Sequence, residues 1–209
     1  LEGLLEKTDV TWAMETQRKH ASLILTLKKK FATIATEWLQ SKKQLSGDEI
    51  DLDAVIELFV RLKTKEPPPD YLYLAANRTL PNVATMILID TRYSTDSWVE
   101  NRCVMDVMKE TVFCIAEVLE DARQQLGIYG FSSNTRQCCN ITSIKNFNER
   151  WNVARNRLGG LPSVGYTRIG PALRHAYRVL SGIKADKKML ILLTDGKPCD
   201  YDRYEGRYG

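Results

Sequence analysis

The stretch VATMILID at residues 83–90 decides the fold class of this chain. It is a short, nearly continuous apolar run that ends in a carboxylate, which is typical of a strand buried on both faces of a parallel sheet. A second run of this kind, MLILL at residues 189–193, leads into Thr194 and Asp195. The two runs therefore predict two buried parallel strands.

The sequence around these runs alternates between strand and helix patterns. Apolar residues recur at helical spacing in three segments, and shorter apolar segments predict one further strand and one edge strand. We expect the helices at 104–119, 148–157 and 169–180, the further strand at 127–131 and the edge strand at 141–144. This alternation predicts an α/β fold with a mostly parallel sheet that is flanked by helices.

The part of the chain before residue 81 has a different character. Apolar residues at spacings of three and four predict one helix up to about Lys43 and a second helix around residues 55–62. Pro67–Pro69 cannot continue a helix and stiffen the chain into an extended linker. We therefore divide the chain into an N-terminal helical segment with its proline linker, residues 1–80, and an α/β domain, residues 81–209.

The bulk composition argues against several classes of protein. The 209 residues carry a net charge of only +4 without a clustered basic excess, so we expect no nucleic-acid partner. No apolar run approaches the ~20 residues of a membrane-spanning helix, and the first residues are not those of a signal peptide. The five cysteines show neither a disulfide framework nor zinc-type spacing, which favours a reducing compartment, the cytoplasm.

Carboxylates follow both apolar runs, at Asp90 and Asp195. Ligands of open α/β sheets bind at the carboxyl ends of the strands. Two carboxylates at one such edge repel each other, and a hard divalent cation such as Mg²⁺ or Mn²⁺ relieves that repulsion. Ser94 and Thr167 add hydroxyl oxygens from two loops. Taken alone, Thr167 is better explained as a helix cap, but together with the other three residues it completes a predicted metal site.

The pattern resembles the metal-ion-dependent adhesion site of von Willebrand factor A-type (VWA) domains. Residues 90–94 resemble the D-x-S-x-S motif of that family, and Thr167 and Asp195 match its middle-loop threonine and late aspartate. The resemblance implies a non-enzymatic binding module in which Ser94 contacts the metal directly and Thr167 contacts it in the ligand-bound state. It also implies that Asp90 and Asp195 bind the metal largely through water. An Asp or Glu of a partner would complete the coordination.

A complete VWA sheet usually needs further strand and helix units after the strand that ends at Asp195. The resemblance therefore implies that the C-terminal part of the fold is missing from these 209 residues. We expect the natural protein to be longer.

Arg92 stands where the family has the first serine of its motif. A guanidinium has no lone pair to offer and stays charged, so it removes one ligand and places a cation beside the metal. The Coulomb repulsion is roughly 1–4 kcal/mol at ~4 Å in a surface-like environment. Either Arg92 points outward and leaves a weakened metal site, or it replaces the metal by pairing with Asp90 or Asp195. Both arrangements predict a low metal affinity.

A narrower resemblance covers the chain from about Leu45 to its end. Segments at residues 51–56, 130–133, 192–198 and 200–209 are similar to the NorD and CbbO proteins. These relatives work with a hexameric MoxR-type AAA+ ATPase, NorQ or CbbQ, to activate nitric oxide reductase or Rubisco. The resemblance implies an adaptor that grips an acidic residue of such a client while the ATPase supplies work. The ATPase is a separate partner, because the chain has no G-x-x-x-x-G-K-[ST] loop.

The alternative function is that of a Mg²⁺-dependent hydrolase or phosphoryl-transfer enzyme that uses Asp90 and Asp195. Such an enzyme needs a general base or a nucleophile within reach of the substrate. His175 is the only histidine of the α/β domain, and it falls in a segment that we expect to pack on the sheet as a helix. Asp90 is a conceivable nucleophile, but the loop that carries Arg92 and Ser94 fits the adhesion motif better.

Overall fold

The computed structural model describes residues 2–37, 40–46, 49–76, 82–99, 101–135 and 138–195. The chain forms two compact units, one made of Leu1–Lys28 with Asn82–Gly209 and the other of Lys29–Pro81. The larger unit thus takes in the first 28 residues, which the sequence pattern assigns to a separate N-terminal segment. The second stretch of this unit begins close to the predicted boundary at residue 81.

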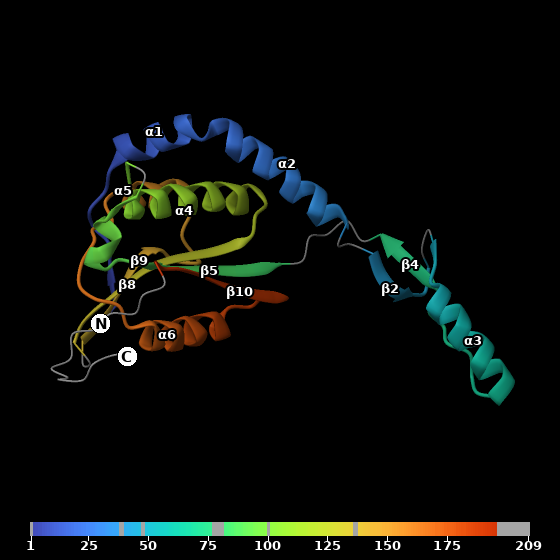
Figure 1. The fold of residues 1–209 in the computed structure, drawn as a ribbon. Helices are drawn as coiled ribbons and strands as arrows, with labels where there is room; N and C mark the ends of the chain where they lie inside the picture. The colour runs from blue at the N-terminus through green and yellow to red at the C-terminus, as the bar shows by residue number, and fades with distance from the viewer. Residues whose placement is uncertain are drawn as a thin grey trace. The chain divides into compact units, whose positions relative to one another are not determined.

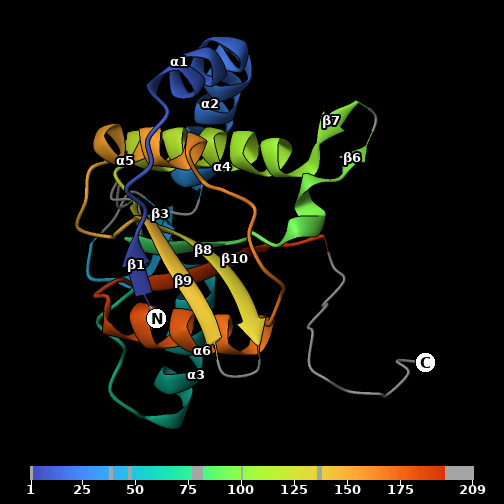
Figure 2. The same ribbon diagram turned by 90° about the vertical axis from the view of Figure 1, so that its left-hand side faces the viewer.

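The larger unit is built on one five-stranded sheet. Figures 1 and 2 show this sheet with helices packed against it. Its strands follow the order β1-β9-β8-β5-β10, and all neighbours are parallel except β8 and β9. The mostly parallel α/β sheet predicted from the sequence is therefore confirmed. In sheet order, the strands are β1 (Glu2–Leu4), β9 (Cys138–Lys145), β8 (Gln125–Thr135), β5 (Val83–Asp90) and β10 (Lys187–Leu193).

Strand β9 corrects one of our expectations, because it is not an edge strand. It pairs antiparallel with β8, where Thr142 lies opposite Gly130, and parallel with β1, where Thr142 lies opposite Gly3. The three-residue β1 therefore covers the edge that the sequence pattern leaves open. A strand this short gives no periodic signal of its own, and only its pairing with β9 makes it recognisable.

The register of the central strands fixes where the candidate site lies. Apart from Val83, every residue of β5 is buried, as expected for a strand between two sheet neighbours that is covered on both faces. Asp90 lies opposite Phe131 of β8, and Ile89 lies opposite Leu193 of β10. The carboxyl ends of β5 and β10 consequently meet at one edge of the sheet, which places Asp90 and Asp195 near each other.

Helices cover both faces of this sheet (Figure 1). Helix α6 (Ile169–Gly182) covers one face, and α4 (Val104–Asp121) and α5 (Trp151–Gly159) cover the other. These three helices confirm the predicted ones with small shifts at their ends. Under α6 the core is formed by residues of β5, β8, β9 and the helix itself: Ala84, Met86, Leu88, Tyr129, Phe131, Ile141, Ala172, Ala176 and Leu180.

Helix α1 (Val10–Lys19) packs outside α4 and α5, as both ribbon views show. Asp9 caps it by accepting a hydrogen bond of 2.9 Å from the backbone N–H of Trp12. The ring of Trp12 meets Phe113 of α4 edge-on at a centroid distance of 5.8 Å, and Phe113 meets Trp151 of α5 at 5.5 Å. These three aromatic rings tie the N-terminal helix to the sheet domain.

The smaller unit contains a three-stranded sheet in the order β2-β4-β3 and helix α3 (Leu52–Thr64). Asp51 begins α3, because its carboxylate accepts the backbone N–H of Asp53 at 3.1 Å. The single helix predicted up to Lys43 is wrong, since the chain forms α1, α2 (Ala21–Glu37) and then strand β2 (Gln40–Gln44). The other strands are β3 (Glu49–Ile50) and β4 (Tyr73–Ala76).

Two further expectations concern the membrane and the cysteines. In the described ranges, no helix is both long and apolar enough to cross a membrane. The described cysteines, Cys103, Cys114, Cys138 and Cys139, are all free thiols, and Cys199 lies outside the described residues. Burial raises the pKa of the Cys114 thiol on α4, and the nearby Glu110 and Glu117 raise it further, so this side chain behaves as an apolar group.

We expect the start of α5 to make the fold sensitive to acid through Glu149. A hydrogen bond from Arg157, 2.6 Å between Nη2 and Oε1, lowers the pKa of this carboxyl below its usual 4.5. Because the folded pKa is depressed, the contribution to stability is present above the unfolded pKa and disappears as the pH falls through the folded one. Glu149→Gln should cost about 0.5–1 kcal/mol near neutral pH, since the pair is partly exposed. Urea unfolding should show this difference shrinking in acid, and a difference independent of pH would contradict the assignment.

Candidate functional site

Asp90 ends strand β5 and is the buried centre of the candidate site. Its side chain has no exposed surface. The hydroxyl of Thr167 donates to its carboxylate at 2.7 Å and 2.8 Å from the two oxygens, and the hydroxyl of Thr194 donates to Oδ2 at 3.0 Å. The backbone N–H of Arg92 donates to Oδ1 at 3.3 Å. A buried carboxylate is stable only with such partners, so these donors explain how Asp90 is accommodated.

Arg92 and Asp195 form an ion pair beside Asp90. The guanidinium donates to the carboxylate of Asp195 with Nε at 3.1 Å from Oδ2, and Nη2 makes a second contact with Oδ1. The Arg92 side chain is 4% exposed and that of Asp195 is 23% exposed. Two parallel contacts of this kind are the strongest form of arginine–carboxylate pairing. The pair links the loop after β5 to the end of β10.

A one-turn helix, η1 (Tyr93–Asp96), holds Arg92 in position. The carbonyl oxygen of Arg92 accepts both the backbone N–H of Thr95 at 3.1 Å and its hydroxyl at 2.6 Å, and Thr95 is completely buried. The hydroxyl of Ser163 donates to the carboxylate of Asp96 at 2.6 Å. The loop after β5 is thereby fixed both internally and to the loop that precedes α6.

The loop that carries Thr167 is hydrogen-bonded through its backbone to both neighbouring segments. The carbonyl of Gly165 accepts the backbone N–H of Tyr93 at 3.1 Å, and Tyr166 exchanges two backbone hydrogen bonds of 2.7 Å with Ser133 of β8. Gly165 has a φ of +74°, and a Cβ there would lie 2.7 Å from the carbonyl oxygen of Ser133. Glycine is therefore required at this position both for its backbone conformation and for the close approach of β8.

The structure brings three of the four predicted metal ligands together, namely Asp90, Thr167 and Asp195. Ser94 lies within η1, but its side chain is outside the described part of the chain. The alternative role of Thr167 as the cap of α6 is not seen, because the N-cap of that helix is Arg168 and the Thr167 hydroxyl donates to Asp90. The role of these residues as metal ligands stays a prediction.

As arranged, these residues do not fit a divalent cation. Both oxygens of Asp195 contact the Arg92 guanidinium, and both oxygens of Asp90 accept protein hydrogen bonds. Among the described residues, no three His, Cys, Asp or Glu side chains come together to hold a metal ion. A cation bound at Asp195 would first have to displace the guanidinium and would then lie beside its positive charge.

The positions of Asp90 and the two histidines bear on the enzymatic alternative. Asp90 is inaccessible as a nucleophile, because it is fully buried and its two oxygens are hydrogen-bonded. His175 lies within α6, and its ring packs edge-on against Tyr129 of β8 at 6.1 Å. His20 lies at the end of α1 and contacts Glu110 of α4 at 2.9 Å.

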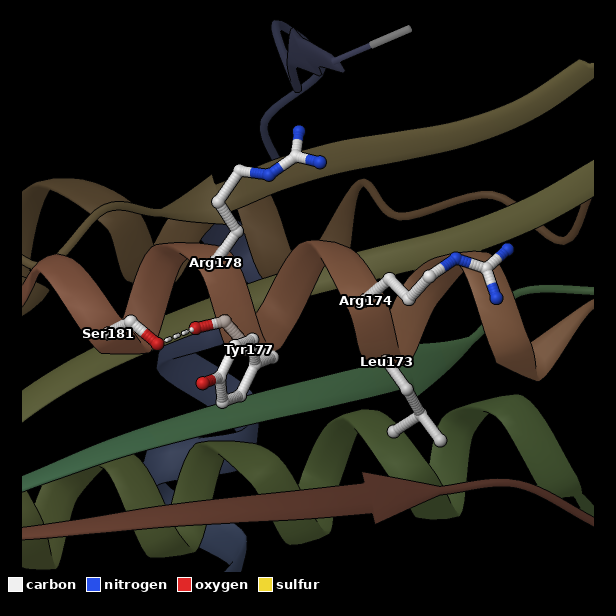
Figure 3. Close-up of a pocket in the computed structure, with 5 residues that line it drawn as sticks. All are labelled: Leu173, Arg174, Tyr177, Arg178 and Ser181. Carbon is white, nitrogen blue, oxygen red and sulfur yellow. Dashed lines mark hydrogen bonds between the residues drawn. The ribbon is translucent and has the colours of Figure 1, made fainter.

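Sequence reasoning missed one surface feature, a shallow hollow along the outer side of α6 (Figure 3). Its lining combines apolar, aromatic and basic side chains from successive turns of one helix: Leu173, Arg174, Tyr177, Arg178 and Ser181. Tyr177 is 76% exposed. The other four residues follow Leu173 by one, four, five and eight positions, and this spacing could have shown that the five side chains share one face of a helix. It could not have shown that nothing else among the described residues covers them.

Comparison with known proteins relates most of this chain to one group of bacterial proteins. The chain is 34% identical over 188 residues to "Protein NorD" of Brucella abortus, and the matched region covers 90% of this chain and 30% of that protein. It is 33% identical over 175 residues to "Protein NorD" of Stutzerimonas stutzeri, covering 83% of this chain and 28% of that one. The chain therefore spans about 30% of the length of these relatives. No family model matches the sequence.

Among solved structures, the chain is similar to the vWF domain of the type V pili tip protein Mfa5 from Porphyromonas gingivalis. The TM-score is 0.46 at 16% sequence identity, and the match covers 56% of this chain and 39% of the other.

Proposed function

Because this chain is a NorD-like protein, we propose that it is a non-enzymatic adaptor that couples a client protein to a MoxR-type AAA+ ATPase. The client binds at the carboxyl edge of the sheet, at the site formed by Asp90, Arg92, Thr167 and Asp195. The ATPase hexamer binds separately and supplies the work of ATP hydrolysis, and the adaptor acts in the cytoplasm.

One observation supports a docking role for this site more than any other. Charged and hydroxyl side chains converge at the end of β5 and β10 on rigid loops, yet the buried Asp90 is blocked as a nucleophile. Preorganised polar groups at the carboxyl edge of an α/β sheet are typical of ligand binding. Because Asp90 is buried and hydrogen-bonded, the arrangement suits recognition better than chemistry.

The relatives suggest which client is the better candidate. Both relatives described above are named NorD, and the nitric oxide reductase branch of the resemblance carries that name. We therefore propose nitric oxide reductase rather than Rubisco as the client. An acidic residue of the client is the expected docking group, as the resemblance to the adhesion motif implies.

Replacing Thr167 by valine tests the docking role directly. Valine keeps the shape of threonine but removes the hydroxyl that donates to both oxygens of Asp90. We expect the loss of this hydrogen bond to cost about 1–3 kcal/mol of stability. We further expect client activation to fall at least about tenfold, because the loop that carries Thr167 is then no longer hydrogen-bonded to Asp90 at the proposed docking site. The measurement is client activity after incubation with the adaptor, the ATPase and ATP.

Thr167→Ser is the matched control, because serine retains the hydroxyl. It should keep most of the client activation, and circular dichroism should show that both variants are folded. If Thr167→Val activates the client as well as the unmodified protein does, the site at the end of β5 is not the docking site.

A further inference from the structure

Arg92 contacts both aspartates on which the predicted metal site depends. Its backbone N–H donates to Asp90, and its guanidinium makes two contacts with Asp195. The side chain is 96% removed from solvent, which is unusual for an arginine without a structural role. Arg92 is therefore part of the site and not a surface residue that happens to lie near it.

The position of this arginine is fixed from both ends of the residue. The buried Thr95 binds the Arg92 carbonyl through its backbone N–H and its hydroxyl. The pair with Asp195 fixes the guanidinium. Because η1 holds the backbone and Asp195 holds the head group, the cation stays where it is without help from a bound ion.

The charges at the site lead to the same conclusion. Asp90 and Asp195 would repel each other at this edge of the sheet, and a divalent cation is one way to offset that repulsion. Here a permanently charged guanidinium already offsets part of it. The same guanidinium stands at the position of the first serine in the motif that the sequence resembles, so one substitution both removes a metal ligand and supplies a cation.

We propose that Arg92 is the resident cation of this site and takes the place of a divalent metal. Metal-free pairing with Asp195 keeps the site assembled, and the docking surface is complete without Mg²⁺. This inference rests on the proposed function only in assigning a client to the site. The metal-free state itself concerns Arg92, Asp90 and Asp195 alone.

Restoring the serine should convert the site to a metal-binding one. Arg92→Ser removes the cation together with its two contacts to Asp195 and adds a hydroxyl ligand. We expect calorimetry to show no binding of Mn²⁺ or Mg²⁺ to the unmodified chain below about 1 mM, and a dissociation constant at least about tenfold lower for Arg92→Ser. Mn²⁺ should also raise the melting temperature of Arg92→Ser and leave that of the unmodified chain unchanged.

Arg102→Ser is the matched control for the change in net charge. Arg102 lies on strand β7 (Arg102–Cys103), its side chain is 50% exposed, and it pairs with Glu110 rather than with the site. The Arg102→Ser variant should gain no affinity for Mn²⁺ or Mg²⁺. The double variant Arg92→Ser with Asp195→Ala should lose the gain, because the carboxylate of Asp195 is then absent.

Three outcomes would overturn the inference. They are metal binding by the unmodified chain as tight as by Arg92→Ser, a gain in Arg92→Ser no larger than in Arg102→Ser, and an unfolded Arg92→Ser that Mn²⁺ does not restore. None of these measurements includes the client or the ATPase. A failure here is therefore distinguishable from a failure of the adaptor proposal, which the Thr167→Val assay tests.

Discussion

Replacing Asp90 by alanine is expected to lower the free energy of unfolding by about 3–5 kcal/mol, the usual cost of removing one partner from a buried charged network. The side chain is fully buried, and it accepts hydrogen bonds from Thr167, Thr194 and the backbone of Arg92. Alanine leaves these donors without their acceptor and leaves a cavity.

Urea unfolding followed by circular dichroism measures this loss. Asp90→Asn is the control, since it keeps the shape and one acceptor oxygen, and the hydroxyls of Thr167 and Thr194 can rotate to suit the amide. It should cost less, about 1–3 kcal/mol. The free energy of unfolding of Asp90→Ala could instead lie within about 1 kcal/mol of that of the unmodified chain, about a fivefold change in the unfolding equilibrium. Asp90 would then not be what holds the segments of Arg92, Thr167 and Thr194 together.

Replacing Phe113 by alanine is expected to have an effect of similar size, about 3–5 kcal/mol, for a different reason. Phe113 is completely buried on α4 and lies between Trp12 of α1 and Trp151 of α5. Its removal leaves a cavity that two rings of other helices line. Because Trp12 loses its main aromatic partner, we also expect α1 to separate from the sheet domain more often.

Limited proteolysis separates these two consequences. Cleavage within α1 should become faster in Phe113→Ala, in addition to the loss of stability seen in urea. Phe113→Leu fills more of the space and should cost less than about 1.5 kcal/mol. If α1 resists cleavage equally in all three proteins, the aromatic contact is not what holds this helix.

The strands that position the site could be predicted because their signal is local. The apolar runs at residues 83–89 and 189–193 are too short for helices, and an aspartate follows each of them within two residues. The carboxyl ends of parallel strands meet at one edge, so the proximity of Asp90 and Asp195 followed from the fold class. The structure confirms the runs as β5 and β10 and places the two aspartates on either side of Arg92.

Features that depend on partners distant in sequence could not be predicted in the same way. Strand β1 has three residues and exists through its pairing with β9, and β2 forms where the helical periodicity seemed to continue. The side chain of Arg92 is the instructive case. Its sequence context allowed it to point outward or to pair with an aspartate, because the choice depends on where Asp195 lies in space.

The backbone hydrogen bonds from Tyr93 to Gly165 and between Ser133 and Tyr166 have a consequence for association. They join the loop after β5, strand β8 and the loop before α6 into one platform, so an arriving protein finds the surface already in its final shape. Little conformational entropy is then lost on contact, and more of the interaction free energy remains as affinity. Such a platform suits the client of the adaptor that we propose, which has to stay bound while the ATPase acts on it.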